Sequence, residues 1–124
     1  MLLIPLSFFG LTSCEGAKQN SLGYEQITQS AAKEIMDTEN DYAIIDARTE
    51  EEFNDGHIEG AIMIPEYEIS KTAEKALPDK NQLILVYCRS GRRSKIASAE
   101  LVRLGYTNVK EFGGIIDWPY EIVK

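Results

Sequence analysis

Apolar residues occur along this chain in two alternating patterns, short continuous runs and positions three or four residues apart. The runs are rich in branched or aromatic residues and predict β-strands at residues 24–27, 42–46, 61–64, 82–87 and 108–112. The spaced positions predict amphipathic helices at residues 28–36, 69–77 and 94–104, with a short helix after Thr49. Strands that alternate with helices predict an α/β fold, in which a parallel central sheet is covered by helices on both faces.

Capping residues and helix breakers mark the ends of these predicted helices. Thr28 and Ser94 each stand directly before a helical pattern and are predicted N-caps. Thr49 and Glu52 have the spacing of a capping box, in which the two side chains satisfy free backbone N–H groups at a helix start. Gly105 is expected to end the helix that begins at Ser94.

The stretch from Tyr87 to Ser94 joins an apolar strand to a helix and reads Tyr-Cys-Arg-Ser-Gly-Arg-Arg-Ser. It places Cys88 at the carboxyl end of a strand and at the start of a helix. In open parallel sheets, ligands bind outside the carboxyl ends of the strands. A helix start adds unpaired N–H groups and positive potential, which attract anions. The sequence therefore predicts that the candidate site lies at Cys88.

The residue types in this stretch indicate a nucleophile beside a small anion. A cysteine at a helix N-terminus with cations nearby reacts as the thiolate. Backbone N–H groups and guanidinium groups in the same loop can hold an oxyanion against the sulfur, and thiosulfate fits that description. Cys88 is the predicted nucleophile, and the predicted substrate-binding residues are Arg89, Ser90, Gly91, Arg92 and Arg93.

Four further motifs, in order along the chain, accompany this loop. They are Asp46-Ala47-Arg48, Glu52-Phe53, Gly56-His57-Ile58-Glu59-Gly60-Ala61 with Ile64-Pro65, and Gly113-Gly114-Ile115 with Trp118. With the loop, they make the chain resemble a single-domain rhodanese, a thiosulfate sulfurtransferase, from about Tyr24 to Trp118. The resemblance implies a rhodanese-like fold and a structural role for His57.

The resemblance also implies the reaction. Sulfane sulfur would pass from thiosulfate, or a similar sulfur-containing anion, to Cys88 as a persulfide. A thiophilic acceptor, such as a thiol or a protein cysteine, would then take it. This chemistry needs no metal and no organic cofactor, and no Cys/His cluster in the sequence has zinc-binding spacing.

Two other functions are compatible with a cysteine in a basic loop. One is a non-catalytic or redox-sensing module of the same fold. The other is a phosphatase or arsenate reductase, because a thiolate in an anion cradle also attacks phosphate or arsenate. Phosphatases of this type place arginine six residues after the cysteine, where this chain has Ser94, so the loop length favours the sulfurtransferase.

The first residues of the chain predict export from the cytoplasm. Residues 2–11 are nearly all apolar but about half the roughly 20 residues of a membrane-spanning helix, and they are interpreted as the core of a signal peptide. Leu11-Thr12-Ser13-Cys14 resembles a bacterial lipobox, in which the cysteine is lipidated. The expected organisation is a signal peptide at 1–13, a lipidated-cysteine tether at 14–22 and a rhodanese domain at 23–124. The domain would lie outside the cytoplasm on a bacterial membrane.

A cytoplasmic location is the alternative, because no Lys or Arg precedes Cys14 as a signal peptide would normally require. The net charge of −7 argues against nucleic acid as a partner and against an anionic membrane surface. Membrane contact is expected only through the lipid anchor. The basic loop is therefore a local exception on an acidic protein.

Overall fold

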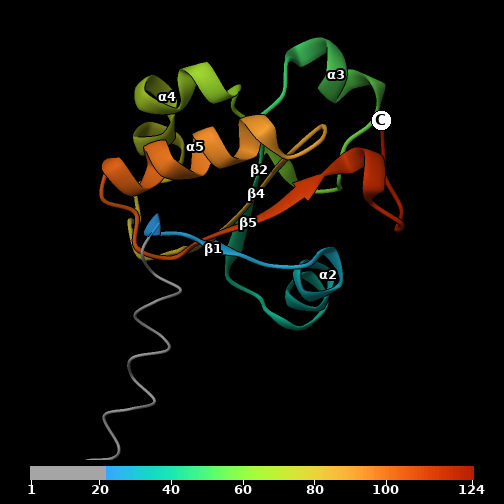
Figure 1. Cartoon of the computed structure of the whole chain (residues 1–124), viewed down its shortest axis with the longest axis horizontal. Coiled ribbons are helices and arrows are strands. Elements are labelled where there is room, and N and C mark those ends of the chain that lie inside the picture. Colours follow the sequence, from blue (N-terminus) through green and yellow to red (C-terminus); the bar gives the residue numbers. More distant parts are fainter. Residues whose placement is uncertain (1–21) are drawn as a thin grey trace, which may run out of the picture.

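The computed structural model describes residues 22–124, whose five strands form one parallel sheet with helices on both faces (Figure 1). The strand order is β1-β5-β4-β2-β3, and every neighbouring pair is parallel. The strands are β1 (Glu25–Gln26), β2 (Tyr42–Asp46), β3 (Ala61–Met63), β4 (Leu83–Cys88) and β5 (Val109–Gly114). The predicted α/β architecture is confirmed, and β4, which ends in Cys88, lies at its centre.

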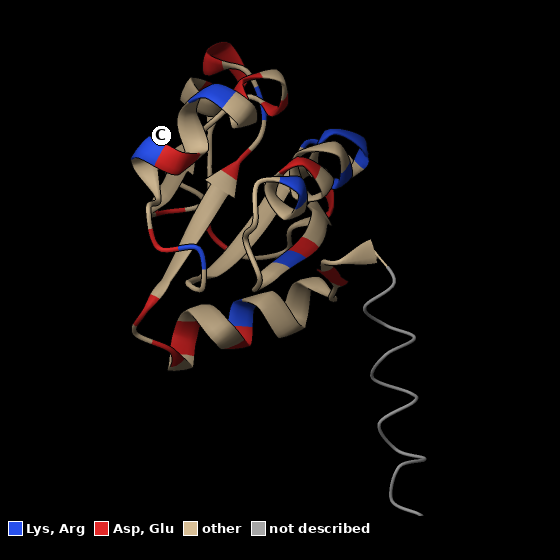
Figure 2. Cartoon of the chain, turned by 90° about the vertical axis from the view of Figure 1, so that its left-hand side faces the viewer, with Lys and Arg blue, Asp and Glu red and all other residues tan. Residues whose placement is uncertain are grey.

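The helices divide between the two faces of the sheet. They are α2 (Gln29–Thr38), α3 (Glu50–Asp55), α4 (Ile69–Ala76) and α5 (Arg92–Arg103), with 3-10 turns η2 (Glu66–Glu68) and η3 (Ile115–Asp117). Figure 1 shows α4 and α5 across one face and α2 below the other. None of these helices is long and apolar enough to cross a membrane. Figure 2 shows that charged residues gather on the helices and connecting loops, while most of the sheet is uncharged.

Two hydrophobic cores lie on opposite faces of the sheet, and β4 contributes to both. Ile84, Val86 and Cys88 belong to the core under α4 and α5. Leu85 and Tyr87 belong to the core under α2. Successive side chains of a strand point to opposite faces. As a result, the neighbours Tyr87 and Cys88 enter different environments at the same end of the sheet.

Two of the three predicted helix starts are confirmed. The Thr28 hydroxyl caps α2 by accepting a hydrogen bond from the backbone N–H of Ala31. Thr49 and Glu52 form the predicted capping box at the start of α3. The predicted cap at Ser94 is wrong, because α5 begins at Arg92, two residues earlier. Gly91 makes the turn there with a φ of 112°, a left-handed conformation that glycine adopts readily. Ser94 therefore lies inside the first turn.

The last strand extends further than its sequence pattern predicts. The prediction ends at Phe112, because two glycines follow, but β5 continues to Gly114, which pairs with Cys88. A Cβ at Gly114 would lie 2.0 Å from the Arg89 carbonyl oxygen, so only glycine fits there. The glycine pair thus allows a close approach of two backbones and does not end the strand.

The predicted signal peptide at 1–13 and the tether at 14–22 lie outside the described residues, apart from Leu22. Cys14 is among the residues outside the described part, so its predicted lipidation stays a prediction.

Candidate active site

A tight loop after β4 holds the Cys88 side chain in place. Cys88 is fully buried at the end of the strand. Its sulfur lies 3.0 Å from the backbone N–H of Gly91, which donates a hydrogen bond to it. Because Gly91 turns the chain back over the sulfur before α5 begins, this N–H group points at the sulfur. A hydrogen bond from an N–H group at a helix start favours negative charge on the sulfur.

The segment after β5 supports the loop from the other side. The backbone N–H of Ile116 donates to the Arg89 carbonyl at 3.2 Å. Gly114 lies against the backbone of Arg89 and Ser90. The loop is therefore held between the start of α5 and the end of β5, which come together only in the folded chain.

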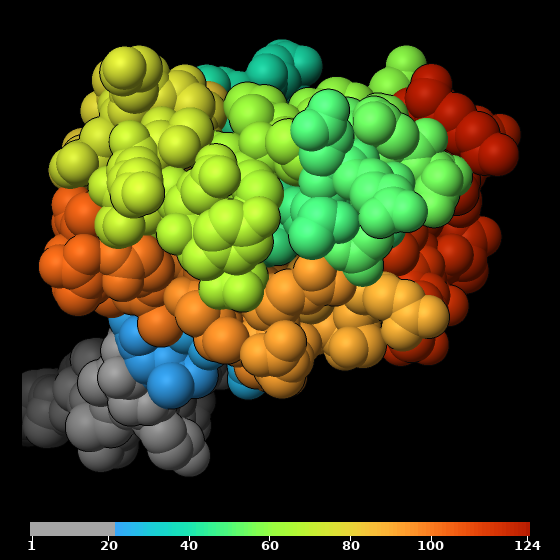
Figure 3. All heavy atoms as spheres, turned by 90° about the horizontal axis from the view of Figure 1, so that it is seen from above, coloured from blue at the N-terminus to red at the C-terminus, as the bar shows by residue number. Residues whose placement is uncertain are grey.

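Besides Gly91, the predicted substrate-binding residues fall into two groups. Arg89, Ser90 and Arg92 are exposed, and none of these side chains forms an ion pair within residues 22–124. Arg93 instead forms a bidentate pair with Glu52 of α3, at 2.8 and 2.9 Å. In Figure 3, the light orange atoms at the start of α5 lie beside the green atoms of α3. Arg93 thus ties the loop to α3, and its contact with substrate stays a prediction.

The Arg93–Glu52 pair perturbs both of its members. The hydrogen bond from Arg93 is the main cause that lowers the pKa of Glu52, to about 2. The same bond raises the pKa of Arg93, with a smaller contribution from the charge of Cys88. Glu52 therefore stays ionised at any physiological pH and holds the guanidinium in place.

Two buried polar residues, Ser94 and Glu111, lie beside the thiol and were not predicted as site residues from the sequence. Ser94 Oγ lies 3.4 Å from Cys88 Sγ and 2.5 Å from a carboxylate oxygen of Glu111 in β5. The same carboxylate oxygen accepts the backbone N–H of Gly113 at 3.0 Å. Glu111 is only 3% exposed. A charged residue within a predicted buried strand is the sequence signal that could have drawn attention to it.

Asp46, Arg48 and Tyr87 form a separate buried cluster on the α2 side of the sheet. The guanidinium of Arg48 donates to both carboxylate oxygens of Asp46, at 2.8 and 2.9 Å. The Tyr87 hydroxyl donates to the same carboxylate at 2.6 Å and accepts the backbone N–H of Ile58 at 3.0 Å. These contacts indicate a structural role, since every charged group in the cluster has a partner.

His57 lies in another part of the fold. Its ring stacks on Phe53 with 3.7 Å between the ring centroids, and its Nδ1 lies 2.9 Å from the Phe53 carbonyl oxygen. Its backbone pairs with Val123 through two hydrogen bonds of 2.8 Å. These contacts agree with the structural role expected for this residue and give it no link to Cys88.

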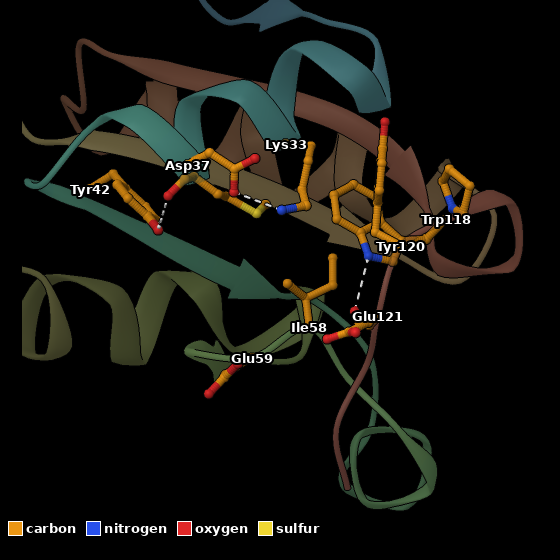
Figure 4. A pocket seen from close by; sticks show the side chains of 10 residues that line it. Lys33, Asp37, Tyr42, Ile58, Glu59, Trp118, Tyr120 and Glu121 are labelled. Carbon is orange, nitrogen blue, oxygen red and sulfur yellow. Dashed lines mark hydrogen bonds and ion pairs between the residues drawn. The ribbon is translucent and has the colours of Figure 1, made fainter.

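A pocket of about 830 Å³ lies between α2 and the C-terminal segment, and none of the Cys88 loop lines it (Figure 4). Its walls include Trp118 and Tyr120 on one side and the Lys33–Asp37 ion pair on the other. Within residues 22–124, no cluster of three or more His, Cys, Asp or Glu could hold a metal ion. No cysteine lines the pocket, so the predicted nucleophile Cys88 and this pocket are separate sites.

The chain is similar to known proteins of one family. Residues 28–119 match the model of the family described as rhodanese-like domain. The chain is 42% identical over 80 residues to the thiosulfate sulfurtransferase PspE of Escherichia coli, an alignment covering 64% of this chain and 77% of that protein. It is 36% identical over 92 residues to a sulfurtransferase of Allochromatium vinosum, covering 73% of this chain and 83% of that protein.

A solved structure agrees with these sequence comparisons. It is described as rhodanese with anions from E. coli, is 40% identical to this chain and superposes with a TM-score of 0.63. The superposition covers 67% of this chain and 98% of that structure.

Proposed function

The chain belongs to the family of rhodanese-like domains, and from this membership we propose that it is a sulfurtransferase that works through a persulfide on Cys88. The proposed donor is thiosulfate or a similar sulfane anion, and the proposed acceptor is a thiol or a protein cysteine. The observation that carries the proposal is the Gly91 N–H group directed at the buried sulfur of Cys88. It supports a thiolate nucleophile at the place where the loop can also hold an anion.

The first half-reaction transfers one sulfur atom to the enzyme. The Cys88 thiolate attacks the outer sulfur of thiosulfate, and a new sulfur–sulfur bond forms. The sulfur–sulfur bond of thiosulfate breaks, and sulfite leaves with its electron pair. Total charge is conserved, because the persulfide carries the negative charge that the thiolate had. Exposed Arg89 and Arg92 are placed to attract the dianion and to stabilise the departing sulfite.

The second half-reaction regenerates the enzyme. An acceptor thiolate attacks the outer sulfur of the persulfide, and Cys88 leaves as a thiolate. No step needs a metal or an organic cofactor, since the thiolate supplies the electron pair in both directions.

The test is the mass of the protein after incubation with thiosulfate under non-reducing conditions. We expect the wild type to gain the mass of one sulfur atom and to lose it when cyanide is added. Cys88→Ser should gain nothing. Cys14→Ser, which replaces the other of the two cysteines, should gain sulfur like the wild type.

A wild type that gains no sulfur from thiosulfate or polysulfide would refute the proposal. It would favour the redox-sensing or binding module, and release of phosphate from an aryl phosphate would then test the phosphatase alternative.

We also propose that Cys14 is lipidated and anchors the domain outside the cytoplasm. The lipobox-like sequence at residues 11–14 supports this proposal. Incorporation of a labelled fatty acid by bacteria that express the full chain is the test. Label on the wild type that is absent from Cys14→Ser is the expected result, and equal labelling of both would refute it.

A further inference from the structure

The Ser94 hydroxyl lies among three groups that all accept hydrogen bonds when Cys88 is a thiolate. Besides Cys88 Sγ at 3.4 Å and the Glu111 carboxylate at 2.5 Å, its oxygen lies 3.0 Å from the Gly91 carbonyl. A serine hydroxyl has one hydrogen to donate. Neither Cys88 nor Ser94 is exposed at all. Water therefore does not reach the thiol or the hydroxyl in this conformation.

Counting hydrogens shows which charge states this cluster accommodates. If Cys88 and Glu111 are both ionised, two negative groups compete for the single Ser94 hydrogen. With one further proton, the Cys88–Ser94 and Ser94–Glu111 contacts each have a donor, and only the Gly91 carbonyl receives none from Ser94. When Cys88 holds that proton, the thiol donates to Ser94 and Ser94 donates to Glu111. When Glu111 holds it, Glu111 donates to Ser94 and Ser94 donates to the thiolate. Two buried like charges that lack an ion-pair partner are costly, and one retained proton avoids that cost.

We propose that Cys88 and Glu111 share this single proton and that Ser94 passes it between them. In the transfer, the thiol proton moves to Ser94 Oγ while the Ser94 proton moves to Glu111. The thiol becomes a thiolate, the carboxylate becomes a carboxylic acid, and the net charge of the cluster is unchanged. Glu111 acts on the nucleophile through Ser94 and is a positioning residue, whereas Ser94 touches the reacting sulfur.

The charged groups around the cluster do not neutralise Glu111. Tyr24, directly before β1, is within reach of its charge, and burial together with the charge of Glu111 raises the pKa of this phenol. Arg93 of α5 is the cation whose charge acts on Cys88, but it is engaged by Glu52 of α3 and also acted on by Glu66 of η2. No Lys, Arg or His within residues 22–124 forms an ion pair with Glu111.

Within the proposed sulfur transfer, on which this role rests, the shared proton has a use. It allows the thiolate to form without releasing a proton through the buried loop. When the acceptor removes the sulfane sulfur, Glu111 can return the proton to the Cys88 thiolate. The leaving sulfur is then neutralised inside the protein, which opposes reversal of the transfer.

The test is a pH titration of the thiolate of Cys88, measured by its ultraviolet absorbance in the full-length protein. The spectrum of Cys88→Ser is subtracted, which removes the contributions of Cys14 and the tyrosines. We expect the wild type to form thiolate in two steps separated by a plateau, because the proton is divided between two groups. Glu111→Gln should give one step. At the pH of the wild-type plateau, the ratio of thiolate to thiol in Glu111→Gln should be at least about tenfold higher than in the wild type, because the repelling carboxylate is absent.

Glu25→Gln is the matched control, because it makes the same isosteric change in a carboxylate of the neighbouring strand β1. Glu25 is paired with Lys110 and its side chain is 43% exposed, so the two steps should remain. If Glu111→Gln does not fold by circular dichroism, the wild-type curve alone decides. A single step in the wild type would overturn the proposal, whether or not the step moves in Glu111→Gln.

This titration is independent of the sulfur-transfer assay. Two steps without any gain of sulfur from thiosulfate would refute the proposed function and leave the shared proton in place. A gain of sulfur together with a single titration step would refute the shared proton and support the proposed function.

Discussion

The two buried carboxylates at the carboxyl end of the sheet differ in their partners. Asp46, on the α2 side, is bound by the guanidinium of Arg48 and by the Tyr87 hydroxyl. Glu111, on the α5 side, has a serine hydroxyl and one backbone N–H group instead. The paired Asp46 is a structural element, whereas Glu111, which forms no ion pair within residues 22–124, is the group that we propose shares a proton with Cys88. The comparison thus separates a structural cluster from a chemical one at the same end of the sheet.

The pleat of β4 produces this division. Tyr87 and Cys88 are adjacent in sequence, but they point to opposite faces of the sheet. The tyrosine completes the ion pair on one face, and the cysteine meets Ser94 on the other. Substitutions on each face should therefore have separable effects, the first on stability and the second on reactivity.

Arg48→Met should have the largest effect, because it leaves Asp46 buried without its cation. We expect a loss of about 3–5 kcal/mol in the free energy of unfolding, measured by chemical denaturation. Arg103→Met removes an exposed arginine from a surface pair and should change stability little. Equal stabilities of Arg48→Met and the wild type would contradict the structural role of the Asp46 pair.

Gly114→Ala should affect the Cys88 side alone. The new Cβ would meet the Arg89 carbonyl and displace the loop. A displacement of about 1 Å in a reacting group costs roughly a hundredfold in rate. We expect such a fall in the rate of persulfide formation, followed by mass spectrometry, while Arg48 and Asp46 keep their pairing. An unchanged rate would show that the close packing of Gly114 does not position the loop.

Tyr87→Phe tests the weaker half of the Asp46 cluster. It removes one hydrogen bond to the carboxylate and leaves the Ile58 N–H group without an acceptor. The expected cost is about 1–3 kcal/mol in the free energy of unfolding, with persulfide formation intact. Tyr67→Phe is the control, since Tyr67 is 64% exposed and should be neutral. A loss of persulfide formation in a folded Tyr87→Phe would contradict the separation of the two faces.

The Glu52–Arg93 pair should have the smallest effect, seen in the pH dependence of stability. The pKa of Glu52 is lowered in the folded protein from 4.5 to about 2. Its contribution is therefore complete above about pH 4.5 and is lost as pH falls through about 2. After allowance for the partial exposure of the pair, we expect about 1–2 kcal/mol. Acid titration of the unfolding free energy measures it. Glu52→Gln should lose stability at neutral pH and lack this acid-dependent loss, and an identical slope would contradict the assignment.

The strands, the helices and the position of Cys88 between a strand and a helix follow from the sequence. Short apolar runs define β2 and β4 to within a residue, and the Thr49–Glu52 capping box marks the start of α3. These features depend on residues close together in the chain, where periodicity and capping act directly. Cys88 is predicted as the nucleophile for the same reason, since the strand, the glycine turn and the basic helix start are contiguous.

Only the tertiary structure decided what surrounds the sulfur. Ser94 meets Glu111 across 17 residues of sequence, and Arg93 meets Glu52 across 41. These contacts depend on the register of β4 with β5 and on where α5 begins. The register shifts between Val86 and Cys88, and α5 is capped by Gly91, three residues before its predicted cap. The local sequence pattern cannot specify such contacts, because they arise when separate elements pack. Packing alone brought the Glu111 carboxylate close to the thiol, with the Ser94 hydroxyl between them.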